Sequence, residues 1–128
     1  MSKSVLDASA LIAYLQDERG ADQVEAALRD ASVISSVNLS EVAAKLGEFG
    51  YPPDEIMRIL RHTNLTVEGF GIETALAAGL LRAATRRQGL SLGDRACLSL
   101  ARELGLPALT ADRNWLTLDV DVRIELCR

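Results

Sequence analysis

Short β-branched or apolar runs alternate along the chain with longer segments in which apolar residues recur at helical spacing. The short runs predict five strands, at positions 4–6, 31–35, 65–70, 107–110 and 120–126. Because helical segments separate these strands, the pattern predicts an α/β fold in which helices cover a parallel sheet of four to five strands. The last strand is expected at an edge of the sheet.

The predicted helices are bounded by glycine and proline residues. Gly20 separates a first helix at 8–16 from a second at 21–30. Gly50 ends a third helix, whose apolar side carries Leu39, Val42, Leu46 and Phe49. The remaining helices are expected at 54–62, after Pro52 and Pro53, at 72–87, closed by Gly89, and from 91 to about Gly105.

The sixth helix carries a carboxylate on its apolar side. At about 100° per residue, Asp94 falls on the same arc as Cys97, Leu98, Leu100, Ala101 and Leu104. The opposite arc carries Arg95, Ser99, Arg102 and Glu103. Because an unpaired buried carboxylate costs several kcal/mol, Asp94 is expected to face a partner or a cation.

Four acidic residues, Asp94 among them, follow the predicted strands or begin the predicted helices. Asp7 comes directly after the first strand and Asp112 two residues after the fourth, at strand ends where open α/β sheets bind ligands. Glu41 and Asp94 are expected in the first turns of their helices, where free backbone N–H groups favour anions. If the four carboxylates converge, their repulsion calls for a cation, and an all-oxygen site suits Mg²⁺ or Mn²⁺.

Each acid also has a structural interpretation, and the sequence leaves the structural and the metal-binding interpretations open. The alternatives are an N-cap for Asp7, a capping box with Asn38 or an ion pair with Lys45 for Glu41, a capping box with Ser91 for Asp94, and a cap on the turn before Trp115 for Asp112.

Composition limits the classes of protein that fit. The 128 residues are 48% hydrophobic and 25% charged, which is typical of one compact domain spanning 1–128. The formal net charge of −4 counts against passive nucleic-acid binding through a uniformly basic surface, but not against an enzyme whose acids are neutralised by metal. Since no apolar run is long enough to span a bilayer and no signal peptide is evident, we expect a cytoplasmic protein without membrane contact.

Other catalytic schemes lack their residues. With His62 as the single histidine, two-histidine acid–base catalysis is excluded, and no motif supports a covalent nucleophile. Cys97 and Cys127 have no metal-ligand pattern around them and are expected as buried small hydrophobes. The lysines, Lys3 and Lys45, are not placed as a phospho-receiver requires, and Ser9 stands where a DxD phosphatase needs an acid.

Four segments, taken in order, resemble the PIN-domain ribonucleases and specifically the VapC-type toxins of bacterial toxin–antitoxin pairs. They are VLDASALIAYL, SSVNLSEVAAKL, GLSLGDRACLSLAREL and LPALTADRNWLTL. The resemblance runs from Val5 to about Val122 and implies a three-layer α/β/α PIN-like domain with a parallel sheet between helical layers.

The resemblance also implies roles for individual residues. Asp7, Glu41, Asp94 and Asp112 match the family's catalytic, metal-binding acids. Ser9 and Thr110 match hydroxyls that orient carboxylates or water, and Asn38 matches a small polar residue with a supporting role. Trp115 stands for the family's usual aromatic, while Asn114 stands where some relatives carry a further acid that bears on a second metal site.

The activity implied by the resemblance is Mg²⁺- or Mn²⁺-dependent hydrolysis of RNA, often tRNA or rRNA, by a metal-activated water. The implied partners are a cognate VapB-like antitoxin and a second copy of the chain in a homodimer. Arg113 and Arg95 adjoin two of the acids and are candidates for RNA phosphate contacts. With 4% aromatic residues the sequence shows no platform for stacking bases. The alternatives are a catalytically silent PIN-like interaction module and a solitary RNA-processing nuclease.

Overall fold

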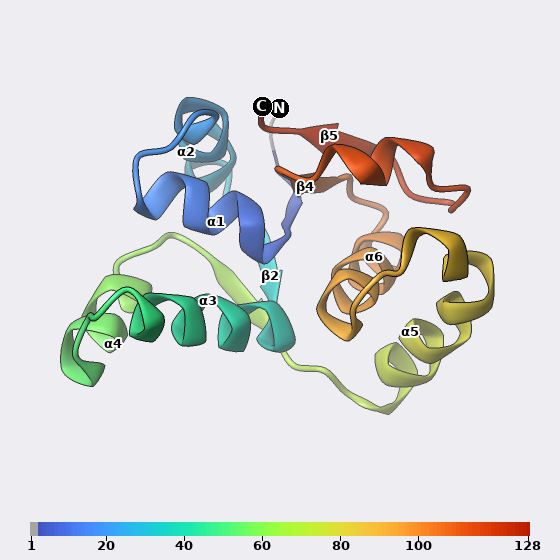
Figure 1. The fold of residues 1–128 in the computed structure, drawn as a ribbon, viewed down its shortest axis with the longest axis horizontal. Helices are drawn as coiled ribbons and strands as arrows, with labels where there is room; N and C mark the ends of the chain where they lie inside the picture. The colour runs from blue at the N-terminus through green and yellow to red at the C-terminus, as the bar shows by residue number, and fades with distance from the viewer. Residues whose placement is uncertain (1–2) are drawn as a thin grey trace.

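A parallel β-sheet forms the centre of the molecule in the computed structural model, which describes residues 3–128 (Figure 1). Its strands are β1 (Val5–Leu6), β2 (Val33–Ser35), β3 (Thr66–Glu68), β4 (Ala108–Thr110) and β5 (Ile124–Leu126). They lie in the order β3-β2-β1-β4-β5, and all neighbouring pairs are parallel. The predicted parallel sheet, with the last strand at an edge, is confirmed, although each strand is shorter than its apolar run.

The connections between the strands are helical, as predicted. The α-helices are α1 (Ala8–Leu15), α2 (Ala21–Arg29), α3 (Ser36–Glu48), α4 (Pro53–Arg61), α5 (Ile72–Ala84) and α6 (Leu92–Leu104). Two short 3-10 helices follow α5 and β4, η1 (Arg86–Gln88) and η2 (Arg113–Thr117).

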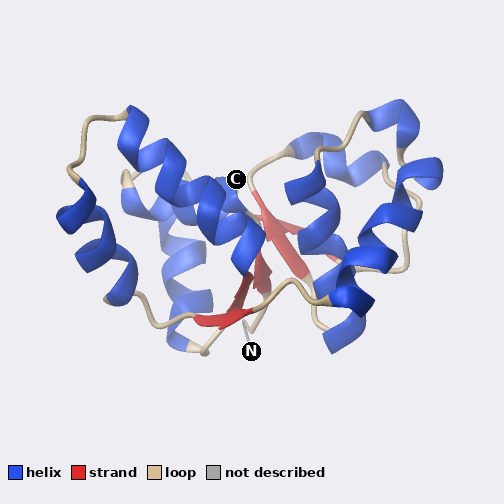
Figure 2. Cartoon of the chain, turned by 90° about the horizontal axis from the view of Figure 1, so that it is seen from below, coloured by secondary structure: helices blue, strands red, loops and turns tan. Residues whose placement is uncertain are grey.

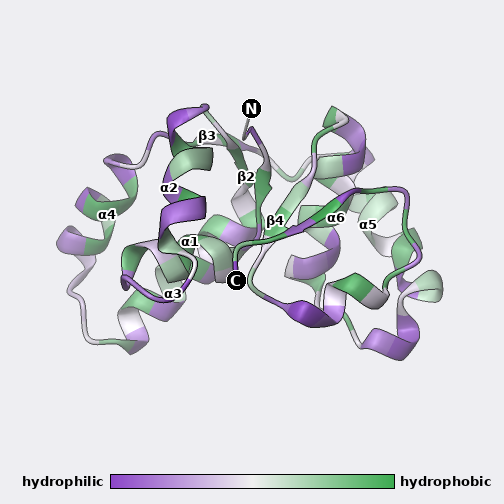
Figure 3. Cartoon of the chain, turned by 90° about the horizontal axis from the view of Figure 1, so that it is seen from above, coloured by the Kyte–Doolittle hydropathy of each residue, from purple (hydrophilic) through white to green (hydrophobic). Residues whose placement is uncertain are grey.

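Helices cover both faces of the sheet, so the three-layer α/β/α architecture is confirmed (Figure 2). Successive strand residues point to opposite faces. Leu6, Ile34 and Leu109 pack in one apolar cluster with α1 to α4, whereas Val5, Val33 and Ala108 pack in a second cluster with α5, α6 and η2. Figure 3 shows the hydrophobic strands β2 and β4 between the two groups of helices.

Three side chains lie differently from their predicted positions on the helix faces. Ser99, expected on a polar face, is 2% exposed, because α6 packs against α5 and α3 as well as against the sheet. Leu104, at the end of α6, and Phe49, just past the end of α3, are 42% and 47% exposed although the periodicity placed both on apolar faces. Hydrophobic periodicity assumes that a helix packs on one face along its whole length. It does not predict burial in a helix that packs on several sides, and it does not predict exposure in the last turn of a helix.

The long helix predicted at 72–87 is interrupted. α5 ends at Ala84, and the buried Thr85 donates a hydrogen bond from Oγ1 to the Leu81 carbonyl at 2.8 Å. The chain continues as η1 and then closes at Gly89, which has a positive φ of 62°. Within residues 3–128, no helix has the length and apolar character needed to cross a membrane.

Candidate active site

Acidic side chains gather where β1 and β4 end and where α3 and α6 begin. Asp7 follows β1, and the side chain of Thr110 at the end of β4 bonds to it. Glu41 on α3 and Asp94 on α6 lie near enough to Asp7 to raise its pKa through charge repulsion. We call Asp7, Glu41 and Asp94 the acid cluster.

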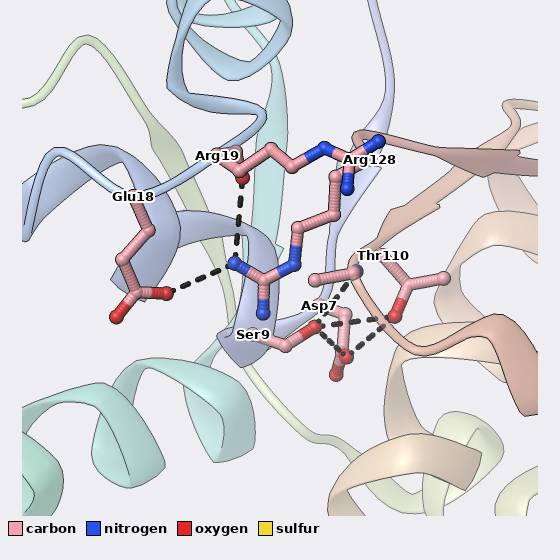
Figure 4. Close-up of polar contacts among 7 residues, drawn as sticks. Asp7, Ser9, Glu18, Arg19, Thr110 and Arg128 are labelled. Atoms are coloured by element: carbon pink, nitrogen blue, oxygen red, sulfur yellow. Dashed lines mark hydrogen bonds and ion pairs between the residues drawn. The ribbon is translucent and has the colours of Figure 1, made fainter.

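Two hydroxyl groups hold the buried carboxylate of Asp7, which is 5% exposed (Figure 4). Ser9 Oγ and Thr110 Oγ1 both donate to Asp7 Oδ2, at 2.7 and 2.9 Å. Asp7 occupies the N-cap position of α1, but its side chain makes no capping hydrogen bond. Its carboxylate is therefore oriented toward the end of β4 rather than used to begin the helix.

The backbone after β4 keeps the two hydroxyls in place. Ser9 Oγ accepts a hydrogen bond from the Ala111 N–H at 3.0 Å, and Thr110 Oγ1 accepts one from the Asp112 N–H at 3.1 Å. With these backbone donors satisfied, each hydroxyl proton is left to point at Asp7. Because both bonds go to Oδ2, the other oxygen, Oδ1, takes part in none of the hydrogen bonds found in the described chain.

Burial is the main reason that the pKa of Asp7 is higher than that of an aspartate in water. Desolvation, together with repulsion from Asp94 and Glu41, outweighs the bonds from Ser9 and Thr110 and raises the pKa of Asp7 from 3.8 to about 6. The ionised form that could bind a cation is therefore favoured only above about pH 6. A nearby positive charge would lower this pKa.

Asn38 connects Glu41 to the start of α6. Its buried Nδ2 donates to Glu41 Oε1 at 2.9 Å and to the Gly93 carbonyl at 3.0 Å. The predicted capping box between Asn38 and Glu41 is wrong, because Ser35 caps α3, so that Asn38 lies inside the helix and Glu41 lies beyond its first turn. The alternative Glu41–Lys45 pair is not formed either, since Lys45 pairs with Glu48 at 3.5 Å.

Gly93 allows the carboxylate of Glu41 to lie directly against α6. A Cβ atom at this position would overlap both carboxylate oxygens of Glu41. Burial, followed by repulsion from Asp94, raises the pKa of Glu41, and the Asn38 bond opposes the shift. The helix spacing gave no signal for Gly93, because the contact joins two distant parts of the chain.

Asp94 takes part in two interactions at once. Its Oδ2 accepts from the Ser91 N–H at 3.0 Å, and its own N–H donates to Ser91 Oγ at 3.1 Å, which completes a capping box. The same carboxylate raises the pKa of both Asp7 and Glu41. Its place on the apolar arc therefore reflects a position beside other acids, while the helix cap gives it local hydrogen bonds.

The side chain of Asp112 caps the short helix that follows β4. Its Oδ1 accepts from the Asn114 N–H at 2.9 Å and caps η2, the helix that carries Trp115. Among the charges that shift the pKa of Asp7 and Glu41, Asp112 does not appear. Its backbone N–H connects it to the site by donating to Thr110 Oγ1, which in turn donates to Asp7.

The two arginines proposed for RNA binding both have partners within the chain. Arg95 is half-buried and donates from Nη1 to the Ala78 carbonyl of α5 at 3.0 Å, so it joins two helices. Arg113 is exposed, and its Nη1 donates to the Arg128 carbonyl at 3.1 Å. Of the two, Arg113 is the more accessible to a bound polyanion.

The chemistry of the donors fits a hard divalent cation, although the donors are not assembled around one point. Among residues 3–128, no three His, Cys, Asp or Glu side chains are arranged to hold a metal ion. Nevertheless, three carboxylates repel one another, and buried Asn38 Oδ1 has no hydrogen-bond partner in the described chain. Oxygen donors of this kind are those that Mg²⁺ and Mn²⁺ prefer.

The comparison with family models decides the classification, since the PIN domain model matches residues 4–120. The chain belongs to the PIN domain family. The matched region of this PIN domain contains all four predicted acids and every strand except β5. None of the curated proteins matches the sequence.

Solved structures share the fold of this PIN domain at low sequence identity. DNA-bound VapBC from Salmonella typhimurium has a TM-score of 0.76 at 21% identity, with 100% of both chains covered. A toxin-antitoxin complex from Klebsiella pneumoniae has a TM-score of 0.67 at 17% identity, covering 91% of this chain and 93% of the other. VapBC-5 from Mycobacterium tuberculosis has a TM-score of 0.63 at 21% identity, covering 100% of this chain and 99% of the other.

Proposed function

We propose that this PIN domain is a divalent-metal-dependent endoribonuclease and acts as the toxin of a VapC-type toxin–antitoxin pair. The observation that carries the proposal is the buried carboxylate of Asp7, oriented by two hydroxyls beside Glu41 and Asp94. An isolated carboxylate would be costly to bury, and repulsion from two more increases that cost. Binding of a cation would lower this cost in free energy, and it is the simplest physical explanation for such a cluster.

Asp7, Glu41 and Asp94 are the residues proposed to hold Mg²⁺ or Mn²⁺, with Asp112 as a fourth ligand if its side chain leaves the η2 cap. Such an ion supplies Lewis acidity and a water that ionises near neutral pH. Ser9 and Thr110 fix one oxygen of Asp7 and leave the other available. Asn38 orients Glu41, and Arg113 is the exposed cation proposed to contact the RNA backbone.

The partner proposed for this chain is a VapB-like antitoxin, and the proposed assembly is a homodimer acting in the cytoplasm. The support is the fold shared with VapBC complexes together with the PIN assignment. The targets, tRNA or rRNA, are proposed on the family resemblance.

Cleavage of a structured RNA with and without Mg²⁺ or Mn²⁺ tests the nuclease proposal. We expect cleavage with either ion, and its loss in Asp7→Asn and in Asp94→Asn. Asparagine keeps an oxygen that can accept the bonds from Ser9 or Ser91, so the fold and the α6 cap should survive. Asp121→Asn makes the same chemical change in an exposed loop and should cleave like the parent. Equal cleavage by all four proteins would indicate a contaminating nuclease.

A catalytically silent PIN-like interaction module is the second candidate, because the cluster is not arranged to hold a metal ion among the described residues. It predicts no cleavage with either ion and no effect of these ions on the thermal unfolding of the protein. A solitary RNA-processing nuclease would cleave but would have no antitoxin gene beside its own.

A further inference from the structure

An open cavity of about 380 Å³ adjoins the acid cluster. Its lining includes Ser9, which donates to Asp7, and Glu41, which belongs to the cluster. Its other walls include Lys45, Phe49, Glu18 and Arg128. The cavity thus extends from the acids to two cations and an aromatic ring.

Three of these side chains form one stripe along α3 and its C-cap. Glu41, Lys45 and Phe49 are spaced four residues apart, which places them on the same side of a helix at intervals of about 6 Å. The order along the stripe is acid, cation and aromatic ring. This interval is comparable with one repeat of an extended nucleic-acid backbone.

The aromatic side chain of Phe49 is exposed to solvent. Among residues 3–128 it is the only exposed aromatic side chain, whereas Trp115 is fully buried. Lys45 Nζ lies 5.7 Å from the centre of the ring, within the range of a cation–π contact. A cation beside an exposed ring can bind a phosphate while the ring stacks on a base.

Arg128 reaches the same cavity from the segment that follows β5. Gly20, with a φ of 97°, has no Cβ that would collide with the Cys127 carbonyl, so the end of the chain packs against the loop between α1 and α2. The guanidinium group of Arg128 donates to Glu18 Oε1 at 3.1 Å and to the Arg19 carbonyl at 3.3 Å. Figure 4 shows it extending toward Ser9 and Asp7.

We propose that this cavity binds an unpaired nucleotide of RNA next to the bond that is cut, with its base stacked on Phe49 and its phosphate held by Lys45 and Arg128. The proposal rests on the proposed function, since it places the adjoining phosphate at the acid cluster. An unpaired nucleotide is required because stacking on a side chain needs a free base face. Sequence tolerance is expected, since every base has such a face.

Binding of a short, labelled single-stranded RNA of random sequence, followed by fluorescence anisotropy, tests the subsite. Every protein carries Asp7→Asn, so that the RNA stays intact during the titration. We expect Phe49→Ala to weaken binding about tenfold, and Phe49→Leu, which keeps an apolar side chain without the ring, to weaken it nearly as much. Lys45→Gln and Arg128→Gln should each reduce the salt dependence of binding, by a slope of about 0.7 per lost phosphate contact.

Arg58→Gln is the matched control for the cations. Arg58 pairs with Glu55 at 3.5 Å with the same spacing as Lys45 and Glu48, but it lies on α4 and does not line the cavity. Its salt dependence should equal that of the parent. The subsite would be overturned if Phe49→Ala bound RNA with the affinity of the parent, or if Phe49→Leu fully restored that affinity. It would also be overturned if Lys45→Gln and Arg58→Gln showed the same salt dependence of binding.

Failure of the subsite and failure of the nuclease proposal give different results. If the unmutated protein cuts RNA but the Phe49 and Lys45 variants bind like the parent, the subsite is wrong and the nuclease stands. If no cleavage occurs with either ion while these variants lose affinity, the cavity binds RNA and the hydrolytic function is wrong.

Discussion

At the scale of single residues, the buried position of Asp7 carries a cost in stability. Its carboxyl group is buried, it lies beside two like charges, and its pKa is about 6. Folding therefore favours the protonated form. Groups held in this way at the expense of stability are typical of functional sites.

The pKa of Asp7 predicts how stability depends on pH without metal. Because the folded pKa lies above the unfolded value of 3.8, the folded state binds more protons between about pH 4 and pH 6. The contribution of Asp7 to stability is therefore greatest at low pH and falls as pH rises through this window, by about 3 kcal/mol at most. Asp7→Asn, which cannot ionise, should not show this fall.

Urea unfolding across this pH range in EDTA checks the prediction. We expect Asp7→Asn to be more stable than the parent above about pH 6, with the difference disappearing near pH 4. A stability difference that stays constant across the range would contradict the assigned burial of the charge.

At the scale of elements, the site depends on the contact between α3 and the start of α6. Asn38 binds Glu41 and the Gly93 carbonyl together, and Glu41 occupies the space that a side chain at position 93 would need. The capping box then holds Asp94 one residue further along α6. A change in the spacing of these helices would move two acids relative to Asp7.

Gly93→Ala tests this contact. The added methyl group should displace the carboxylate of Glu41 and weaken Mn²⁺ binding several-fold, although alanine favours the helix by about 0.5–1 kcal/mol. Gly79→Ala on α5 is the matched control, because a Cβ there meets nothing within 4 Å. Calorimetric titration and thermal unfolding of both variants separate displacement of Glu41 from loss of fold. Equal Mn²⁺ affinity in Gly93→Ala and the parent would show that the close approach is not required.

The elements themselves could be predicted from the sequence far better than the contacts between them. The alternation of short apolar runs, such as 31–35 and 107–110, with helical segments predicted the parallel sheet and the edge position of its last strand, but it did not predict the order of the other strands. Side chains at helix ends were predicted less well. Ser35, rather than a later residue, caps α3, which moves Glu41 out of the first turn. Capping depends on one hydrogen bond, and several nearby polar residues could have provided it.

At the scale of the whole molecule, the sequence predicted which acids lie near the strand ends but not how their side chains are arranged. The strand-end rule placed Asp7 and Asp112 at the same edge of the sheet, yet Asp112 turns to cap η2. The contacts of Gly93, Phe49 and Arg128 join segments far apart in the chain. Local spacing carries no information on such contacts, so the adjoining cavity could not be predicted.

The proposed homodimer gives a further prediction at this scale. Ile72, Leu76 and Leu80 on α5 are 78%, 62% and 80% exposed and form an apolar stripe at helical spacing. If this stripe is covered in the dimer, Leu80→Glu should shift the protein toward the monomer in size-exclusion chromatography with light scattering. Leu116→Glu, at a side chain 56% exposed on η2, is the control and should leave the assembly unchanged. A parent that is monomeric at every concentration would exclude the homodimer.

The central claim is that Asp7, Glu41 and Asp94 bind one divalent cation together, and calorimetric titration with Mn²⁺ near pH 6, where about half of Asp7 is protonated, tests it most directly. We predict saturable binding by the parent, with a release of protons as Asp7 ionises, and its loss in Asp7→Asn and Asp94→Asn but not in Asp121→Asn. Equally weak binding by the parent and all three variants would contradict the claim.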